Sequence, residues 1–371
     1  MPKPQQTNGF RKIMRRSFLV MLGLITGQVL AEYFAIPQNR NNFFKLLSQT
    51  ISKLLALKSP SSTDVTPQPI KTTPILTPSP PQKKPLSVKA SPTPKSVASQ
   101  KSPELTKGSQ KKARPIQVSR KTIAGVSFYQ TTIDLNDPET FITIGLANNA
   151  TMANTMQVTN GDESFEKMVA RYQAAVVVNG TFFGKDEKEA VLGNMVAGGK
   201  FLKYSRWENY GTTLGLKAGK KLEMVTARKE GKPEWNQHWF SITCGPRLLK
   251  EGQLWLAPLS EGFKDSHVLN EASRSAIGFD ASGSKLFLVT FLSSLSLKQE
   301  ADIMKAIGCF EAMNLDGGAS LGLAHKRDIL VSPGRNLTNV IVVYDKEFPA
   351  PAALKLSWQR FQNGGLPAIP N

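Results

Sequence analysis

The chain has 371 residues and a formal net charge of +19, and this charge is unevenly distributed. Residues 1–120 contain 20 Lys and Arg against 3 Asp and Glu, whereas the remaining 251 residues contain 27 against 25. A nucleic-acid-binding domain needs a basic surface on its folded part, so this nearly neutral remainder argues against a nucleic-acid partner.

Residues 1–36 have the pattern of an export signal or an N-terminal membrane anchor. Four basic residues precede an apolar stretch over residues 17–31: Arg11, Lys12, Arg15 and Arg16. This order is typical of a secretory signal, and the arginine pair also resembles a twin-arginine motif. Cleavage could follow Ala31, or an uncleaved segment reaching Ile36 could span a membrane once, with Glu32 at the interface. Both alternatives predict an exported protein, periplasmic or in the cell envelope.

Two further segments separate this leader from the rest of the chain. Residues 37–58 place apolar side chains at helical spacing between lysines, which fits either an interfacial helix on an anionic membrane or an amphipathic segment with no partner. Residues 59–118 follow, and from Ser59 to Pro115 there are 12 prolines and no aromatic residue. Such a composition buries too little apolar surface to offset chain entropy, so we predict a disordered, extended linker rich in Pro, Ser and Lys.

Residues 119–348 are predicted to form one domain, and 349–371 a tail that wraps loosely around it. Apolar patterns predict strands over 127–133, 140–146, 176–178, 286–291 and 340–344, helices over 164–172 and 297–308, and hairpins over 217–223 and 248–254. Helices and strands alternate loosely. This predicts an α/β or α+β domain around a mixed β-sheet with flanking helices.

Four segments place glycine or polar residues at the ends of apolar runs, where backbone can approach a ligand closely. They are Asn179-Gly180-Thr181-Phe182-Phe183, Gly245-Pro246-Arg247, Arg274-Ser275-Ala276-Ile277-Gly278 and Asn314-Leu315-Asp316-Gly317-Gly318-Ala319-Ser320, and Arg335 and Asn339 lie just before the last predicted strand. In this order they resemble the phosphodiester glycosidase family, over roughly residues 120–345. The animal member of this family removes N-acetylglucosamine from phosphomannose.

The resemblance implies an exported bacterial hydrolase whose partner is a carbohydrate phosphodiester. Guanidinium groups match phosphate oxygens, and a carboxylate can assist at the anomeric carbon. The implied catalytic residues are Asp316, Arg274 and Asn179. The implied substrate-binding residues are Gly180, Thr181, Arg247, Gly317, Gly318, Ser320, Arg335 and Asn339. The sequence requires no metal or other cofactor, and candidates for a second carboxylate are Asp280, Glu271 and Glu311.

Three functions stay open on the sequence alone. The first is a glycosidase that hydrolyses a sugar-1-phosphodiester linkage in envelope or exopolysaccharide glycans. The second is a non-catalytic polysaccharide-binding module, because Thr181 and Ala319 stand where the family usually has glycine and would reshape a sugar pocket. The third is a serine hydrolase using Ser320 with His325, for which five residues of spacing say nothing about geometry. Cys244 and Cys309 could pair if the motifs converge.

Overall fold

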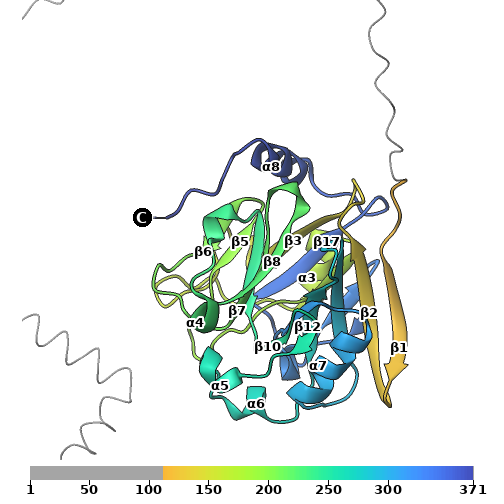
Figure 1. Cartoon of the computed structure of the whole chain (residues 1–371). Helices are drawn as coiled ribbons and strands as arrows, with labels where there is room; N and C mark the ends of the chain where they lie inside the picture. Colours follow the sequence, from red (N-terminus) through yellow and green to blue (C-terminus); the bar gives the residue numbers. More distant parts are fainter. Residues whose placement is uncertain (1–111, 371) are drawn as a thin grey trace, which may run out of the picture. The chain divides into compact units, whose positions relative to one another are not determined.

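The computed structural model describes residues 112–370, so the predictions for residues 1–111 lie outside the described range (Figure 1). The strands of this part form three sheets, and neighbouring strands within each sheet pair antiparallel. The first sheet has the order β1-β2-β13-β12-β14-β10-β11. Its strands are β1 (Gln117–Ile123), β2 (Val126–Asp134), β13 (Lys285–Phe291), β12 (Ser275–Phe279), β14 (Glu311–Asn314), β10 (Arg247–Lys250) and β11 (Gln253–Leu254).

The second and third sheets have five strands each. The second has the order β16 (Asp328–Val331), β15 (Leu323–His325), β4 (Val176–Asn179), β17 (Asn339–Tyr344) and β3 (Phe141–Leu146). The third has the order β6 (Lys200–Lys203), β5 (Met195–Ala197), β9 (Phe240–Cys244), β7 (Thr212–Leu216) and β8 (Leu222–Thr226). One hydrophobic core contains residues of all three sheets, such as Ile277, Val342 and Ile242. The three sheets therefore pack as one domain.

Strands β4 and β17 are buried along their whole length, which explains their continuous apolar sequences. A strand covered on both faces has no solvent side on which to place polar residues. Both strands carry an asparagine at one end, Asn179 at the end of β4 and Asn339 at the start of β17. Because the two strands run antiparallel and Val340 pairs with Asn179, the two asparagines lie at the same edge of the second sheet.

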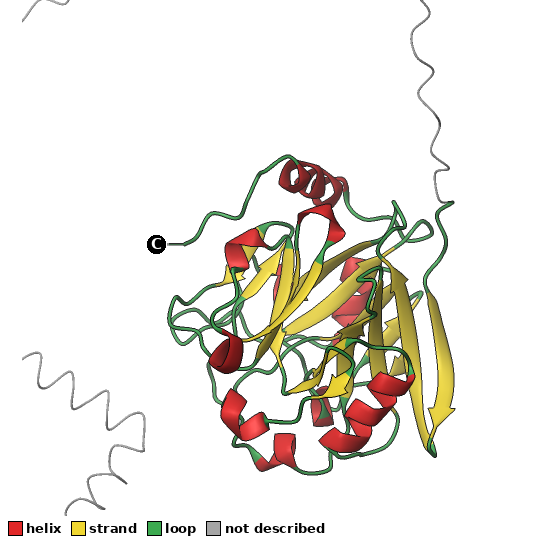
Figure 2. Cartoon of the chain, in the orientation of Figure 1, coloured by secondary structure: helices red, strands yellow, loops and turns green. Residues whose placement is uncertain are grey.

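The helices are few and lie around the sheets (Figure 2). They are α3 (Phe165–Tyr172), α4 (Ala227–Glu230), α5 (Pro258–Glu261), α6 (Ser266–Leu269), α7 (Leu297–Ala306) and α8 (Ala352–Gln362), with 3₁₀ turns η1 (Ala147–Asn149), η2 (Ala218–Lys220), η3 (Trp235–Gln237) and η4 (Gly318–Ser320). Ser164 caps α3, and Ser296 with Gln299 forms a capping box at α7. No helix within residues 112–370 combines the length and apolar character needed to cross a membrane.

The predicted fold class is confirmed: the domain is sheet-rich, with flanking helices. Three features differ in detail from the expectation. The strands form three antiparallel sheets and not one mixed sheet. The tail from residue 349 contains the helix α8, in which Trp358 packs edge-on against Trp239 with ring centroids 4.9 Å apart. At the other end, ordered structure begins before residue 119, because Ile116 is buried and donates its amide to Asp345 Oδ2 at 2.8 Å.

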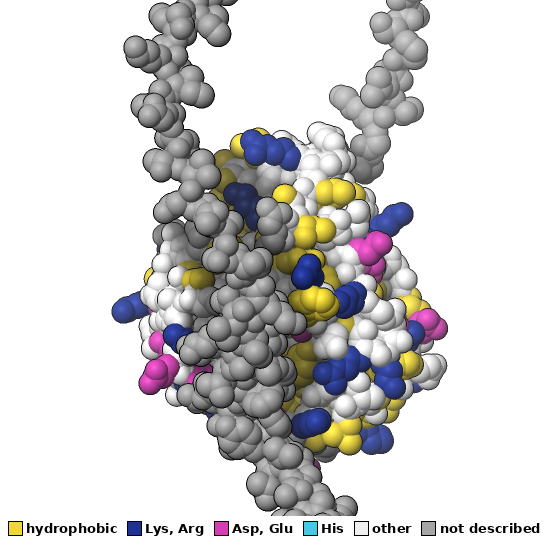
Figure 3. Space-filling model, turned by 90° about the vertical axis from the view of Figure 1, so that its left-hand side faces the viewer, with side chains coloured by type: hydrophobic (Ala, Val, Ile, Leu, Met, Phe, Trp, Pro, Cys, Tyr) yellow, Lys and Arg dark blue, Asp and Glu magenta, His cyan; other side chains and the backbone are white. Residues whose placement is uncertain are grey.

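Basic and acidic side chains are interspersed among neutral ones on the face shown in Figure 3. The part of this face that the structure describes differs from the continuous basic stripe of a nucleic-acid-binding face.

Candidate active site

Asp316 lies in the loop that leaves β14, and its carboxylate is held from two directions. The carboxylate accepts a hydrogen bond from the Gly317 amide at 2.9 Å (Oδ1) and faces the Arg335 guanidinium at 3.2 Å (Oδ2). The residue is only 6% exposed. Burial raises the pKa of Asp316, and hydrogen bonds from Ser320, Gly317 and Arg335 oppose that rise. A desolvated carboxylate beside one cation is suited to stabilising positive charge on a bound substrate.

Asn179 joins the second sheet to the Asp316 loop of the first. Its Nδ2 donates to the backbone carbonyl of Asp316 at 2.6 Å and to Ser275 Oγ at 3.0 Å, and its Oδ1 accepts from the Gly322 amide at 3.2 Å. The side chain is buried, and both ends of its amide are used in these bonds. In this arrangement Asn179 positions the loop that carries Asp316.

Two predicted glycines allow this close packing of backbone. A Cβ on Gly180 would lie 2.0 Å from Asn339 Oδ1, and a Cβ on Gly317 would lie 2.2 Å from the Ser273 carbonyl oxygen. Real Cβ atoms do not approach so closely, so neither position accepts a side chain without movement of its neighbours. Asn339 also fixes the turn after β4, because its side-chain amide accepts a hydrogen bond from the Thr181 N–H at 2.8 Å and donates one to the Thr181 C=O at 3.1 Å.

Among the predicted arginines, Arg335 contacts Asp316 and is also partly exposed to solvent. Its Nε donates to Ser320 Oγ at 2.7 Å, and its guanidinium lies 4.0 Å from the centroid of the Phe183 ring. The side chain is 29% exposed, unlike those of Arg247 and Arg274. A cation fixed by an aromatic face, a hydroxyl and a carboxylate is well placed to hold an incoming phosphate.

The Arg274 guanidinium turns into the protein interior. It donates to the backbone carbonyls of Leu295 at 2.8 Å and Val268 at 3.0 Å, and also to that of Asn270. It lies 3.7 Å from the buried carboxyl of Glu300, and burial lowers the pKa of Arg274. Its neighbours Ser273 and Ser275 both contact the Asp316 loop. This geometry favours support of the loop over direct contact with a phosphate.

Arg247 is also enclosed, within a network of three glutamates. Its guanidinium pairs with Glu230 and with Glu311, and its backbone amide donates to the Glu261 carboxyl. Glu261 is fully buried, and burial raises its pKa to about 7. The predicted role of Arg247 in substrate binding stays a prediction, and its contacts favour a structural one.

Comparison with known proteins identifies the family. Residues 172–344 match the model of the phosphodiester glycosidase family. Residues 172–344 belong to this family. The matched segment contains every residue predicted above as catalytic or substrate-binding.

Solved structures similar to this chain include one from zebrafish and one from Synechocystis. The catalytic domain of zebrafish N-acetylglucosamine-1-phosphodiester alpha-N-acetylglucosaminidase, auto-inhibited by its pro-peptide, is 19% identical; the match covers 65% of this chain and 85% of that one, with a TM-score of 0.51. A hypothetical protein from Synechocystis is 19% identical with a TM-score of 0.47, and the match covers 62% of each chain, less than two thirds of that protein. At such identity the zebrafish likeness shows the fold alone. No curated protein matches this chain in sequence.

The two residues that replace glycines of the family pattern, Thr181 and Ala319, differ in burial. Thr181 is buried and its hydroxyl donates to the Thr243 carbonyl at 2.6 Å, so this side chain is committed to packing within the phosphodiester glycosidase domain. Ala319 is exposed. Only Ala319 therefore adds bulk on the solvent side of the site.

The serine-hydrolase hypothesis is wrong for this geometry. Ser320 Oγ contacts the Arg335 guanidinium, whereas the His325 ring contacts the Ile116 carbonyl at 3.2 Å. The hypothesis needs the His325 ring as a base within hydrogen-bond reach of Ser320, and Ser320 instead contacts Arg335 and Asp316. Cys244 and Cys309 are both buried and free, so these two cysteines do not form a disulfide.

The candidates for a second carboxylate lie in other surroundings. Glu311 pairs with Arg247, Asp280 accepts the amides of Ser284 and Lys285 in the turn after β12, and Glu271 is exposed. Sequence reasoning did not select Glu189, whose pKa is raised by partial burial and by Asp162 and lowered by the charge of Arg335. Its position in the charged run of residues 185–189 gave no signal, since such a run usually forms a solvated loop.

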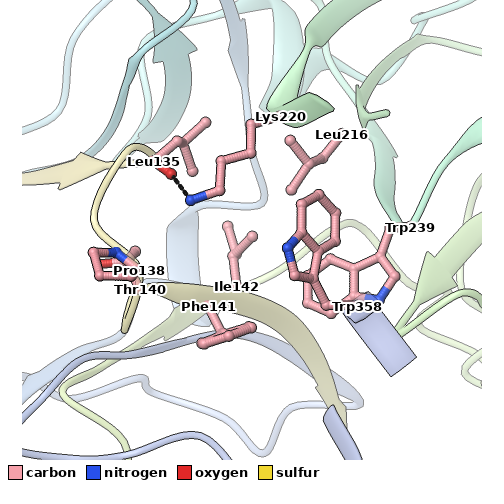
Figure 4. Close-up of a pocket in the computed structure, with 9 residues that line it drawn as sticks. All are labelled: Leu135, Pro138, Thr140, Phe141, Ile142, Leu216, Lys220, Trp239 and Trp358. Carbon is pink, nitrogen blue, oxygen red and sulfur yellow. Dashed lines mark hydrogen bonds between the residues drawn. The ribbon is translucent and has the colours of Figure 1, made fainter. Parts of the chain in front are cut away.

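Two cavities lie away from Asp316. The apolar one between β3 and α8 has a volume of about 30 Å³, room for a water molecule but not for a sugar (Figure 4). It is closed by Trp239, Trp358 and Lys220, whose ammonium donates to the Leu135 carbonyl. A wider groove of about 540 Å³ lies beside the β7–β8 and β12–β13 turns. Within residues 112–370 no three His, Cys, Asp or Glu side chains gather as metal ligands.

Proposed function

We propose that this protein is an exported glycosidase that hydrolyses a sugar-1-phosphodiester linkage in envelope or exopolysaccharide glycans. The family of residues 172–344 supports hydrolysis of a phosphodiester glycoside. The observation that carries the proposal is the contact between Asp316 and Arg335, a buried carboxylate 3.2 Å from a partly exposed guanidinium. The similar zebrafish structure is an N-acetylglucosamine-1-phosphodiester glycosidase by name, which makes a glycosyl phosphodiester the first class of substrate to test.

In the proposed reaction, Arg335 binds the phosphate and Asp316 faces the anomeric carbon. The bond between that carbon and the bridging oxygen breaks, and its electron pair stays with the phosphate. The carboxylate of Asp316 stabilises the positive charge that develops on the sugar ring. A water molecule supplies the hydroxyl of the released sugar, and the other product is a phosphomonoester. Phosphate is already a good leaving group, so a carboxylate and a cation provide the main catalytic elements.

The remaining predicted residues have supporting roles in this proposal. Asn179 and Asn339 fix the turn after β4, and Arg274 fixes the backbone against which the Asp316 loop packs. Fixed donors and acceptors lose no energy to reorganisation during the reaction, which is where much enzymatic rate enhancement arises. The leader and linker would deliver this domain to the periplasm or cell envelope, where an uncleaved N-terminal segment would hold it at the membrane.

The test is release of free sugar by the purified chain. UDP-N-acetylglucosamine and a set of glycosyl phosphodiesters that vary the sugar are incubated with the protein. Both products are measured: the free sugar, and UDP or the phosphomonoester released with it. Equal release of both products, absent in Asp316→Asn, supports the glycosidase. Binding of the same compounds without release by the unaltered protein would contradict it and would support the polysaccharide-binding module.

A further inference from the structure

Trp207 is a large apolar side chain that lies in solvent with two cations beside its ring. It is 73% exposed, whereas Trp235 and Trp239 are buried. The Arg206 guanidinium lies 4.7 Å from the centroid of the Trp207 ring, and the Lys232 ammonium lies 5.9 Å from it. Lys232 Nζ also donates to the Arg206 carbonyl at 2.5 Å. Because most of the indole is exposed beside these cations, its apolar surface can contact a ligand.

The loop that carries Trp207 is held on both sides of this residue. The buried side chain of Asn194 accepts the Ser205 N–H at 2.7 Å and donates to the Ser205 C=O at 3.1 Å. Ser205 Oγ accepts the Trp207 N–H at 3.3 Å, and Arg228 Nε donates to the Asn209 carbonyl at 3.0 Å. A ligand that contacts Trp207 therefore meets a backbone that is already ordered, which reduces the entropy cost of binding.

The loop over residues 204–211 lies at the end of the third sheet nearest to the Asp316 loop. It joins β6 to β7, and β7 begins opposite Cys244, the last residue of β9 (Figure 1). The next residue, Gly245, donates its amide to the Asn314 carbonyl at 2.9 Å, two residues before Asp316. The register of the third sheet thus places the Trp207 loop and the Asp316 loop at the same side of the domain.

Packed aromatic rings connect this loop with the turn after β4. Tyr210 packs against Phe263 with ring centroids 4.6 Å apart, and Phe263 packs edge-on against Phe182 at 6.1 Å. Phe182 precedes Phe183, whose ring centroid lies 4.0 Å from the Arg335 guanidinium. The loop therefore borders the region of the arginine that is proposed to bind phosphate.

We propose that Trp207, Arg206 and Lys232 bind a second sugar-phosphate unit of the substrate, beyond the linkage that is hydrolysed. The indole packs against the apolar C–H face of the sugar ring, and the two cations bind the phosphate attached to that sugar. This inference rests on the proposed function and names its class of substrate. That class is a polymer of sugars joined by phosphodiesters, and a nucleotide sugar occupies only the part of the site at Asp316.

A membrane surface is the other partner that such residues can contact. Tryptophan is frequent at membrane interfaces, and clusters of about four to eight Lys and Arg bind anionic lipids. The loop over residues 204–211 contains one basic residue, Arg206, and one acidic residue, Glu208, which pairs with Lys203 at 3.7 Å. This low charge and the position beside the candidate site favour a sugar phosphate.

The first test compares synthetic glycosyl phosphodiesters of one unit and of several units as substrates of the full chain. Trp207→Ala should raise KM for the longer substrate by about tenfold or more, because it removes a large apolar contact, with a smaller effect on kcat. The increase for the one-unit substrate should be far smaller. Trp207→Phe keeps an aromatic face and should restore part of the loss. An equal effect of Trp207→Ala on both substrates would overturn the inference.

The matched control for Trp207→Ala is Leu356→Ala. Leu356 is also exposed, at 51%, and lies on α8. This helix contacts the β7–β8 turn, where the Gly219 amide donates to Gln362 Oε1 at 3.0 Å, at the opposite end of the third sheet from Trp207. Leu356→Ala should leave KM for both substrates as in the unaltered protein.

A second measurement separates this inference from the proposed function. Binding of the longer compound to the full chain with Asp316→Asn is measured by calorimetry, with and without Trp207→Ala. Weaker binding in Trp207→Ala supports the second unit even if no probe releases sugar, a result that overturns the glycosidase alone. Equal binding, or no binding to either protein, overturns the inference whatever the activity. If Trp207→Ala instead loses binding to vesicles of phosphatidylglycerol and phosphatidylcholine and keeps binding of the sugar phosphate, the loop contacts a membrane and the inference is wrong.

Discussion

Asp316→Asn is the substitution that most directly separates catalysis from structure. Asparagine retains the size of the side chain and an oxygen that can accept the Gly317 amide, which now donates at 2.9 Å. It removes the charge that faces Arg335. If this charge stabilises the transition state, kcat should fall at least a hundredfold, which corresponds to about 2.7 kcal/mol at about 1.36 kcal/mol per decade.

The same substitution should change stability little, because two effects oppose each other. The folded protein loses an ion pair whose arginine is 29% exposed, so water can still solvate the guanidinium. It also no longer buries a carboxylate, whose desolvation is what raises the pKa of Asp316. Thermal melting and sugar release are measured on one preparation, with Asp280→Asn, a turn aspartate after β12, as the control. Near-normal turnover, or a large drop in melting temperature with little loss of rate, would refute the catalytic role.

Three further predictions follow from contacts described above. Arg335→Lys should raise KM at least tenfold with a smaller effect on kcat, since lysine cannot bond Ser320 and a phosphate through one planar group; equal KM in steady-state assays would contradict the phosphate role. Removal of residues 1–111 should leave specific activity unchanged, whereas removal of residues 1–120 should lower the melting temperature because it deletes Ile116 and half of β1. Burial raises the pKa of Glu300 from 4.5 to about 8, so the folded protein retains a proton that the unfolded chain loses first. The contribution of Glu300 to the free energy of unfolding is therefore full below pH 4.5 and is lost as the pH rises through about 8. Denaturant unfolding at several pH values should show a weaker loss of stability in Glu300→Gln than in the unaltered protein. An equal loss in both would contradict this role of Glu300.

The elements that sequence predicted are those whose pattern is local. Strand β17 and helix α7 were readable because a continuous apolar run and an apolar stripe with a capping serine are contained within a dozen residues. The helix α8 carried a similar stripe, Leu354, Trp358 and Phe361, yet the flanking prolines and glycines favoured a loose tail. The division into three sheets was not predictable, because it depends on pairings such as β2 with β13 between residues far apart in the chain.

Sequence motifs indicate which residues lie near one another better than they indicate what each residue does. The motifs placed Asn179, Asp316, Ser320 and Arg335 in one region, since glycine-rich turns at strand ends are distinctive in sequence. They could not distinguish an arginine that faces solvent from one whose donors are used by backbone carbonyls, as in Arg274. The direction of the Arg274 side chain depends on the backbone carbonyls of residues 268, 270 and 295, and no local sequence pattern relates these residues to Arg274. The catalytic and substrate-binding roles stay predictions for mutagenesis.

The glycines at 180 and 317 also determine how this domain could be given a new substrate. A Cβ at Gly180 would collide with Asn339 and a Cβ at Gly317 with the Ser273 backbone, so a substitution at either position would damage folding and turnover together, and a library built on them would yield mostly inactive protein. Ala319 and the loop over residues 185–188 are exposed, whereas the neighbouring Gly318 has open space but a left-handed φ of 57° that strains any side chain. Laboratory evolution aimed at a different sugar should therefore vary these exposed residues and keep Gly180 and Gly317 constant.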